Sequence, residues 1–202
     1  MTVLEHSFQY CQPVPDDRSR TALIRTMRTL LRRQGYAATG LKQVLTESGV
    51  TTGSLYHHFP GGKQELAEAA LTASGRSVGA ALAHLLDTSD SCADAMGAWT
   101  DAMAAALAAD PRDGCPVMPT AVEAVHASEP LRRAAGSAFL AWRDLLADRL
   151  AREGAPDATG TATAVIALLE GALLLARTTG DPSALHAARR AAVDLLRPAE
   201  TS

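Results

Sequence analysis

The sequence predicts an all-α protein of about nine helices, in which a three-helix N-terminal head containing a helix-turn-helix is joined to a helical body. Hydrophobic residues make up 47% of the 202 residues but aromatic residues only 4%, so alanine and leucine supply most of the apolar surface. Both residue types are strong helix formers. Apolar residues also recur at helical spacing, and the chain lacks the long Val/Ile/Thr runs that are typical of strands.

Three helices are expected near the N-terminus. In residues 18–34 the apolar positions follow the spacing i, i+4, i+7 and i+8, and Gly35 ends the segment. A second helix is expected over 41–48. Thr51 is a natural N-cap for a third helix, which Pro60-Gly61-Gly62 ends.

Six further helices are expected in the rest of the chain, at residues 63–86, 90–109, 119–127, 131–152, 159–179 and 182–196. The most apolar run, 162–176, is interrupted by Glu170 and is short for a membrane span, so we interpret it as a buried helix. The expected organisation is a flexible arm (1–16), a helix-turn-helix domain (17–77) and a body for ligand binding and dimerisation (78–202).

Charge is distributed unevenly along the chain, although the net charge is only -3. Residues 16–76 hold nine Lys and Arg against five Asp and Glu, whereas residues 77–202 hold ten against sixteen. A basic front joined to an acidic back indicates that the N-terminal part binds an anion. No signal peptide or membrane anchor is expected, so the protein is predicted to be cytoplasmic.

The three cysteines, Cys11, Cys92 and Cys115, are widely spaced and odd in number. A disulfide framework is therefore not expected, which fits a reducing compartment. Cys92 and Cys115 have two interpretations at this point: a redox sensor, or buried and inert thiols.

Residues 41–59 have the pattern of a helix-turn-helix, with Gly49 between two short helices. On the second helix Leu55 and Phe59 face the core. The opposite stripe carries hydroxyl, phenol and imidazole groups, suited to hydrogen bonding in a DNA major groove; it consists of Thr52, Gly53, Tyr56 and His57.

Gly53 has two interpretations: it lets the backbone approach DNA, or it is a tolerated glycine near a helix N-terminus. The segment Gly61-Gly62-Lys63 places a lysine at a helix N-terminus, where backbone amides and the helix dipole favour a phosphate. Lys42 and the arginines of 18–34 are either further phosphate contacts or ordinary solvated surface.

The segment GYAATGLKQVLTESGVTTGSLYHHFPGGKQELAEAAL resembles the DNA-binding signature of the TetR family of bacterial transcriptional regulators. GCPVMPTAVEA and LLEGALLLART are similar to its subgroup of lincomycin-resistance and flavonoid-responsive repressors. The resemblance implies a double-stranded operator that is a pseudo-palindrome, with no cofactor. Gly40 stands where many members have Ser or Thr, which makes Thr39 the better candidate there. The expected DNA-binding residues are Thr39, Lys42, Thr51, Thr52, Gly53, Ser54, Tyr56, His57 and Lys63.

The resemblance further implies a homodimer formed by the last two helices, with Glu170, Gly171 and Leu174 at the interface. Glu170 has an alternative role in an ion pair with Arg177. A small apolar effector is implied in the body, where stripes of Met and Trp are either core or pocket. The candidate ligand-binding residues are Met96, Trp99, Met103, Met118, Val122, His126, Phe139 and Trp142.

Enzyme and metal sites are poorly supported by the sequence. Glu123-x-x-His126 is half of a di-iron motif, but the second half is missing. His57 and His58 are adjacent on a helix and therefore point about 100° apart, which suits chelation badly. No metal site is expected. The alternative function is a helical small-molecule carrier or enzyme whose N-terminal helices are only structural.

Overall fold

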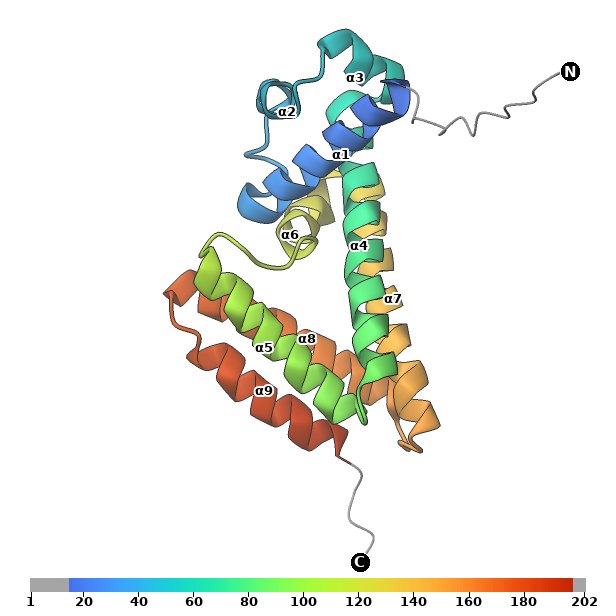
Figure 1. Ribbon diagram of the computed structural model, residues 1–202, viewed down its shortest axis with the longest axis vertical. Helices are drawn as coiled ribbons and strands as arrows, with labels where there is room; N and C mark the ends of the chain where they lie inside the picture. The colour runs from blue at the N-terminus through green and yellow to red at the C-terminus, as the bar shows by residue number, and fades with distance from the viewer. Residues whose placement is uncertain (1–14, 198–202) are drawn as a thin grey trace, which may run out of the picture.

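The computed structural model describes residues 15–197, which form nine α-helices and contain no strand (Figure 1). The all-α prediction is therefore confirmed. The helices are α1 (Pro15–Gln34), α2 (Leu41–Ser48), α3 (Thr52–His58), α4 (Gly62–Thr88), α5 (Cys92–Ala109), α6 (Met118–Ala127), α7 (Glu129–Arg152), α8 (Ala158–Thr179) and α9 (Ser183–Leu196).

The predicted boundaries agree with the observed ones to within three residues, and the bounds of α2 agree at both ends. The largest difference is at α1, which begins at Pro15, so Pro15 and Asp16 are helical and do not belong to an arm. The remainder of the predicted arm, with Cys11, lies outside the described residues.

Short polar side chains and glycines fix the helix ends. Thr51, Ser91, Ser128 and Asp157 accept hydrogen bonds from backbone amides in the first turns of α3, α5, α7 and α8. Gly49 and Gly180 end α2 and α8 with φ of 68° and 72°, a left-handed conformation that side chains disfavour. Thr51 thus has the predicted capping role.

The head consists of α1, α2 and α3 at the top of Figure 1. Leu23 and Met27 of α1, Val44 of α2, and Leu55 and Phe59 of the α3 segment are all buried in one core. This packing holds α3 rigidly against α1 and leaves its other side exposed, as the helix-turn-helix pattern predicted.

The helix α4 runs from the head into the body and packs along α7 (Figure 1). The expected domain boundary at residue 77 falls within α4, so this helix joins the two parts. The Trp142 indole N–H of α7 donates to the carbonyl oxygen of Gly75 at 2.9 Å. A side chain at Gly75 would bring a Cβ within 2.7 Å of the Ala138 Cβ, so glycine permits this close approach.

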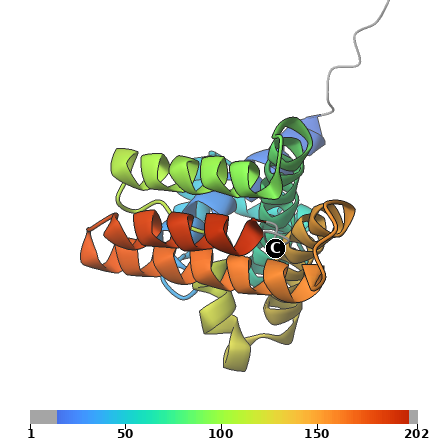
Figure 2. The ribbon, with the colours of Figure 1, turned by 90° about the horizontal axis from the view of Figure 1, so that it is seen from below.

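The other body helices, α5, α8 and α9, pack against one another beside the α4–α7 pair (Figure 2). The helix α6 lies beneath α1, between the head and the body (Figure 1). The body therefore reaches the head through the continuous helix α4 and through α6 with the loop that precedes it, and Arg177 of α8 also contacts the end of α1.

The helix α8 is apolar along most of its length. With 22 residues and a mean hydropathy of 1.7 in its most apolar window, it is long and apolar enough to cross a membrane, so the expectation that this run is too short is wrong. The same composition is found in core helices of soluble proteins, and α8 packs here against α7 and α9. Only 28% of the window is buried, which leaves an exposed apolar face.

Candidate DNA-binding face, internal cavity and junction

The exposed face of α3 carries the polar stripe predicted from the sequence. Thr52, Gly53 and His57 are exposed, and half of the Tyr56 side chain is exposed. Thr51 Oγ1 accepts from the Ser54 amide at 3.3 Å, so the Thr51 hydroxyl both caps the helix and remains at the surface. His58 is half-buried beside the Phe59 ring, which places it on the protein side of the helix.

Gly53 is not required by packing within the chain. A Cβ at this position would meet no atom within 4 Å, and the φ angle is not in the left-handed region. The space that a side chain would occupy therefore lies outside the protein. This is where the hypothesis of close approach places the DNA.

Thr39 does not fit the predicted phosphate contact. Its side chain is fully buried, and its hydroxyl donates to the Gly35 carbonyl oxygen at 2.6 Å. The hydroxyl stabilises the corner between α1 and α2, because it satisfies a carbonyl at the end of α1. Lys42, on α2, is exposed and remains a candidate.

The N-terminus of α4 is less open to an anion than the sequence indicated. The Gly61 amide donates to a Glu65 carboxylate oxygen at 2.7 Å, and the Gly62 amide donates to the Phe59 carbonyl. The Lys63 ammonium lies over the Tyr36 ring, 4.1 Å from its centroid. Burial lowers the pKa of Lys63, and the nearby Glu123 carboxylate partly offsets this effect.

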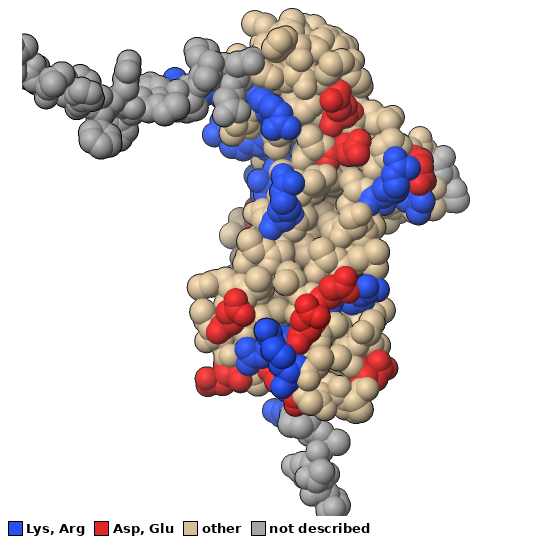
Figure 3. All heavy atoms as spheres, turned by 90° about the vertical axis from the view of Figure 1, so that its right-hand side faces the viewer, with Lys and Arg blue, Asp and Glu red and all other residues tan. Residues whose placement is uncertain are grey.

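Charged side chains are distributed unevenly over the surface. Figure 3 shows Lys and Arg side chains along one edge of the upper part of one face, with Asp and Glu side chains beside them, and mixed acidic and basic side chains lower down. The uppermost part of this face, at the tip of the head, carries no charged side chain. A tip without charged side chains, with basic side chains along one edge below it, suits hydrogen bonding to bases with phosphates at the flanks.

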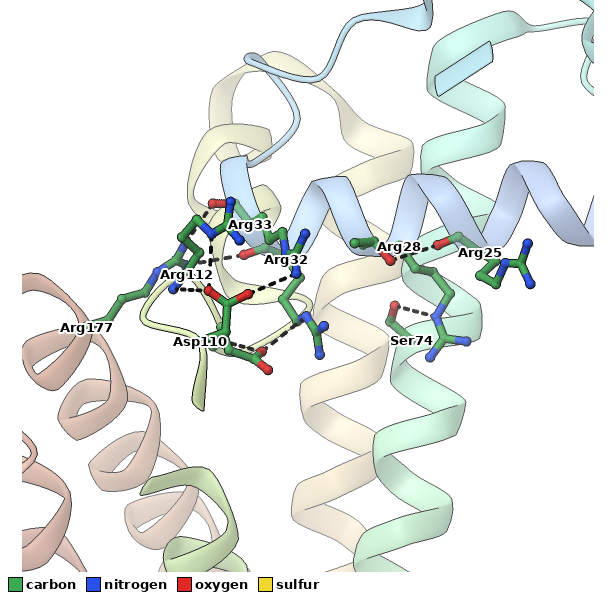
Figure 4. Close-up of polar contacts among 11 residues, drawn as sticks. Arg25, Arg28, Arg32, Arg33, Ser74, Asp110, Arg112 and Arg177 are labelled. Atoms are coloured by element: carbon green, nitrogen blue, oxygen red, sulfur yellow. Dashed lines mark hydrogen bonds and ion pairs between the residues drawn. The ribbon is translucent and has the colours of Figure 1, made fainter. Parts of the chain in front are cut away.

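Arginines at the C-terminal end of α1 contact the body and do not point away from it (Figure 4). Arg32 pairs with Asp113 at 3.2 Å, and Arg33 pairs with Asp110 at 2.9 Å. From α8, Arg177 donates to the carbonyl oxygens of Arg32 and Arg33 at 3.3 and 2.7 Å. A cation at these terminal carbonyls caps α1, so the alternative role of Glu170, an ion pair with Arg177, is wrong.

Glu123 of α6 provides a further link to the head. Its carboxylate accepts from the Ala37 amide at 2.7 Å and packs against Gly35, whose φ is +77°. Among the described residues, no group of three His, Cys, Asp or Glu side chains is placed to hold a metal ion. The contacts of Glu123, Arg177, Arg32 and Arg33 form what we call the junction.

A cavity of about 410 Å³ lies directly beneath α1. Its walls come from α1, α4, α5, α7, α8 and the loop before α6. They include three arginines (Arg25, Arg28, Arg32), two tryptophans (Trp99, Trp142), and an apolar set consisting of Val78, Leu82, Met103, Ile166, Leu169 and Leu173. The cavity and the head therefore share residues of α1.

Three of the eight predicted ligand-binding residues line this cavity: Trp99, Met103 and Trp142. Met118 and Val122 line a separate hollow between α6 and α8. Met96 is fully buried core, and Phe139 packs edge-on against the Trp142 ring at 5.3 Å. The side chain of His126 is outside the described part of the structure. Helical spacing identified apolar faces but could not separate core from cavity.

Glu170 lies in the cavity wall and not on the predicted dimer face. The Cys115 thiol donates to its carboxyl group, whose other oxygen, Oε2, is buried and has no hydrogen-bond partner among the described residues. Burial raises the pKa of Glu170 from 4.5 to about 7.

This pKa predicts a pH-dependent stability. Between about pH 4.5 and 7 the folded chain retains a proton that the unfolded chain has lost, so the free energy of unfolding falls as pH rises through this window and then levels off. Glu170→Gln removes the titration. We expect the variant to gain stability relative to the wild type at pH 8 but not at pH 5, as measured by urea unfolding. If the free energies of unfolding of the variant and the wild type differ by the same amount at both pH values, the assignment of a raised pKa to a buried Glu170 carboxyl is contradicted.

The two described cysteines do not have the properties of a redox sensor. Burial raises the pKa of Cys92 to about 12, with a further contribution from Glu153, and raises that of Cys115 well above its usual range. Both thiols are buried, and the thiolate is the reactive form. The structure thus favours inert thiols.

An exposed apolar strip runs along α8 and α9. Half or more of each of the side chains Leu174, Leu175 and Leu195 is exposed, and Gly171 lies on the same side of α8 with open space around it. Of the predicted dimer residues, Gly171 and Leu174 are therefore available at the surface.

Comparison with known proteins agrees with this arrangement. Residues 23–70 match the family described as bacterial regulatory proteins, tetR family, and residues 92–191 match the LmrA/YxaF-like transcriptional regulator C-terminal domain. The HTH-type transcriptional regulator LmrA of Bacillus subtilis is 31% identical over 182 residues, which cover 89% of this chain and 97% of that protein. YxaF of the same organism is 34% identical over 170 residues, covering 83% and 89%.

Solved structures show the same fold. The reduced form of E. coli NemR superposes with a TM-score of 0.79 at 23% identity, covering 91% of this chain and all of that one. The regulatory protein TetR from Rhodobacter sphaeroides gives a TM-score of 0.80 at 24% identity, covering 89% and 99%.

Proposed function

This chain belongs to the TetR family of bacterial transcriptional regulators, and we propose that it is a repressor that leaves its operator when a small molecule occupies the cavity beneath α1. The proposed site of action is the cytoplasm, and the proposed targets are nearby efflux or metabolic genes. The observation that carries the proposal is the position of the cavity, whose wall includes three arginines of α1, a helix of the DNA-binding head.

The junction supports a route from the cavity to the head. Asp113 both lines the cavity and pairs with Arg32, and Arg177 caps the end of α1. A ligand that displaces the loop before α6 therefore acts on α1 directly. Because α3 packs on α1, a movement of α1 changes the position of the recognition helix.

TetR-family regulators form dimers, and we propose that α8 and α9 supply the interface here through their exposed leucines. A two-fold dimer reads two half-sites about one DNA turn apart, roughly 34–36 Å, so the operator is expected to be a pseudo-palindrome. Ligand binding lowers affinity if it moves the two α3 helices away from this spacing.

Footprinting of the upstream region of the gene, with and without candidate ligands, tests the proposal. We expect a protected palindrome and an affinity that falls steeply with salt, because phosphate contacts release counterions. Binding to any DNA without a protected site would contradict a specific regulator. A monomer that binds small molecules but no specific DNA would favour the alternative, a helical carrier or enzyme.

Tyr56→Ala is expected to weaken the specific complex by about tenfold, the loss typical of one base-edge or phosphate contact. Its half-exposed ring makes little contribution to the core, so stability is expected to change little. A gel shift on the footprinted site measures the effect, and His84→Ala, at an exposed position of α4 in the body, is the control. Unchanged affinity for Tyr56→Ala would remove Tyr56 from the DNA-binding face.

A further inference from the structure

The cavity is polar at one end and apolar at the other. On α4 its wall runs from Ser74, which accepts a hydrogen bond from Arg28 at 3.1 Å, to Leu82. Eight residues of helix span about 12 Å, so Leu82 lies about that far from the arginines. On α8 the wall is apolar except for Glu170.

Positive charge is in excess at the polar end. Arg25, Arg28 and Arg32 meet only two carboxyl groups in the wall, and one of these, Asp113, is already paired with Arg32. The other, Glu170, resists ionisation because burial raises its pKa to about 7. The charge balance therefore favours an anion over a cation.

Hydrogen-bond donors remain available at the same end. A guanidinium carries five N–H donors in a planar fork. The structure pairs Nε of Arg28 with Ser74 and Nε of Arg32 with Asp113, and gives their terminal nitrogens no partner among residues 15–197. Figure 4 shows both side chains descending from α1 on its body side. Each guanidinium fork matches the geometry of a carboxylate, to which it can donate two parallel hydrogen bonds.

We propose that the effector is an amphipathic anion whose acidic group binds Arg28 and Arg32, and whose apolar body lies between Trp99, Met103 and Trp142. This inference rests on the proposed function and adds a ligand class to it. The unpartnered Glu170 oxygen offers a third polar contact, to a hydroxyl or carbonyl of the ligand. An acid at Arg32 competes with Asp113 for the guanidinium, which couples binding to the junction.

Both tryptophans of the chain line the cavity, so intrinsic fluorescence reports its occupancy. Decanoate, decanamide and decylammonium share an alkyl chain and differ in the charge of the head group. We expect decanoate to bind the wild type about tenfold or more tightly than either of the others, the loss typical of a charge-assisted hydrogen bond. Equal or tighter binding of the amide or the ammonium, or no decanoate-dependent change, would overturn the proposal.

Arg28→Gln and Arg32→Gln are expected to abolish the preference for decanoate over decanamide. Arg76→Gln removes the same charge from an exposed position on α4 outside the cavity wall and is expected to preserve it. Thermal unfolding checks the fold of each variant. If a variant is unstable, the comparison of the three ligands on the wild type still tests the proposal. If the preference for decanoate over decanamide persists in both Arg28→Gln and Arg32→Gln, these arginines do not bind the acidic group and the proposal is overturned.

A gel shift on the footprinted operator separates this inference from the proposed function. Decanoate is expected to release the wild-type protein and to have at least a tenfold smaller effect on Arg32→Gln, because Arg32 joins ligand and junction. If no specific complex forms without ligand, the proposed function fails. If the complex forms and decanamide releases it as well as decanoate does, only the ligand class fails.

Discussion

Leu174→Glu is expected to convert the dimer into monomers and to lower operator affinity by about two orders of magnitude or more. Half of the Leu174 side chain is exposed in the single chain, on the apolar strip that we assign to the interface. In a two-fold interface the same substitution occurs on both sides, so two carboxylates lose water together without a counter-charge. Without the dimer, each head binds its half-site independently. The gain in operator affinity that comes from linking the two heads, typically 10²–10⁴-fold, is then lost.

Leu140→Glu is the matched control, because Leu140 has the same exposed fraction, 50%, but belongs to α7 and not to the two helices that we assign to the interface. We expect it to remain dimeric and to bind the operator normally. Sedimentation analysis gives the oligomeric state, and a gel shift gives the affinity. A dimeric Leu174→Glu together with a monomeric Leu140→Glu would place the interface on another face.

The fold was predictable because local signals agree along the whole chain. Thr51 caps α3, glycines stand just beyond α1, α2 and α8, and apolar residues keep helical spacing through the long helices. The main error, at the start of α1, arose because Pro15 was interpreted as part of a loose arm. Proline is well suited to the first turn of a helix, where its missing N–H costs nothing.

The site was only partly predictable, because its key contacts join residues far apart in sequence. Arg33 and Asp110, or Glu123 and Ala37, are separated by about 80 residues, and nothing in either segment identifies the partner. The exposed stripe of α3 follows from periodicity within seven residues. Glu170 was misplaced since Gly171 beside it is exposed, and adjacent positions on a helix point about 100° apart.

Trp142→Ala is expected to lower the free energy of unfolding by about 3–5 kcal/mol, the range found for truncation of large buried side chains. The indole is 3% exposed, and its N–H donates to Gly75, where α4 and α7 approach closely. The substitution removes both the packing and this hydrogen bond. Urea unfolding measures the loss, and an unchanged slope with urea shows that the denatured state is comparable.

Trp99→Ala provides the comparison, since Trp99 also lines the cavity but is only half-buried, and no hydrogen bond of its side chain is found in the described structure. It is expected to cost less stability than Trp142→Ala while changing ligand affinity. The helix α4 connects the head to the body, so loosening α4 from α7 also makes the position of α3 less fixed. Trp142→Ala is therefore expected to bind the operator less tightly, even under conditions where it remains folded. Equal losses of stability for the two variants would show that the α4–α7 contact has no special role.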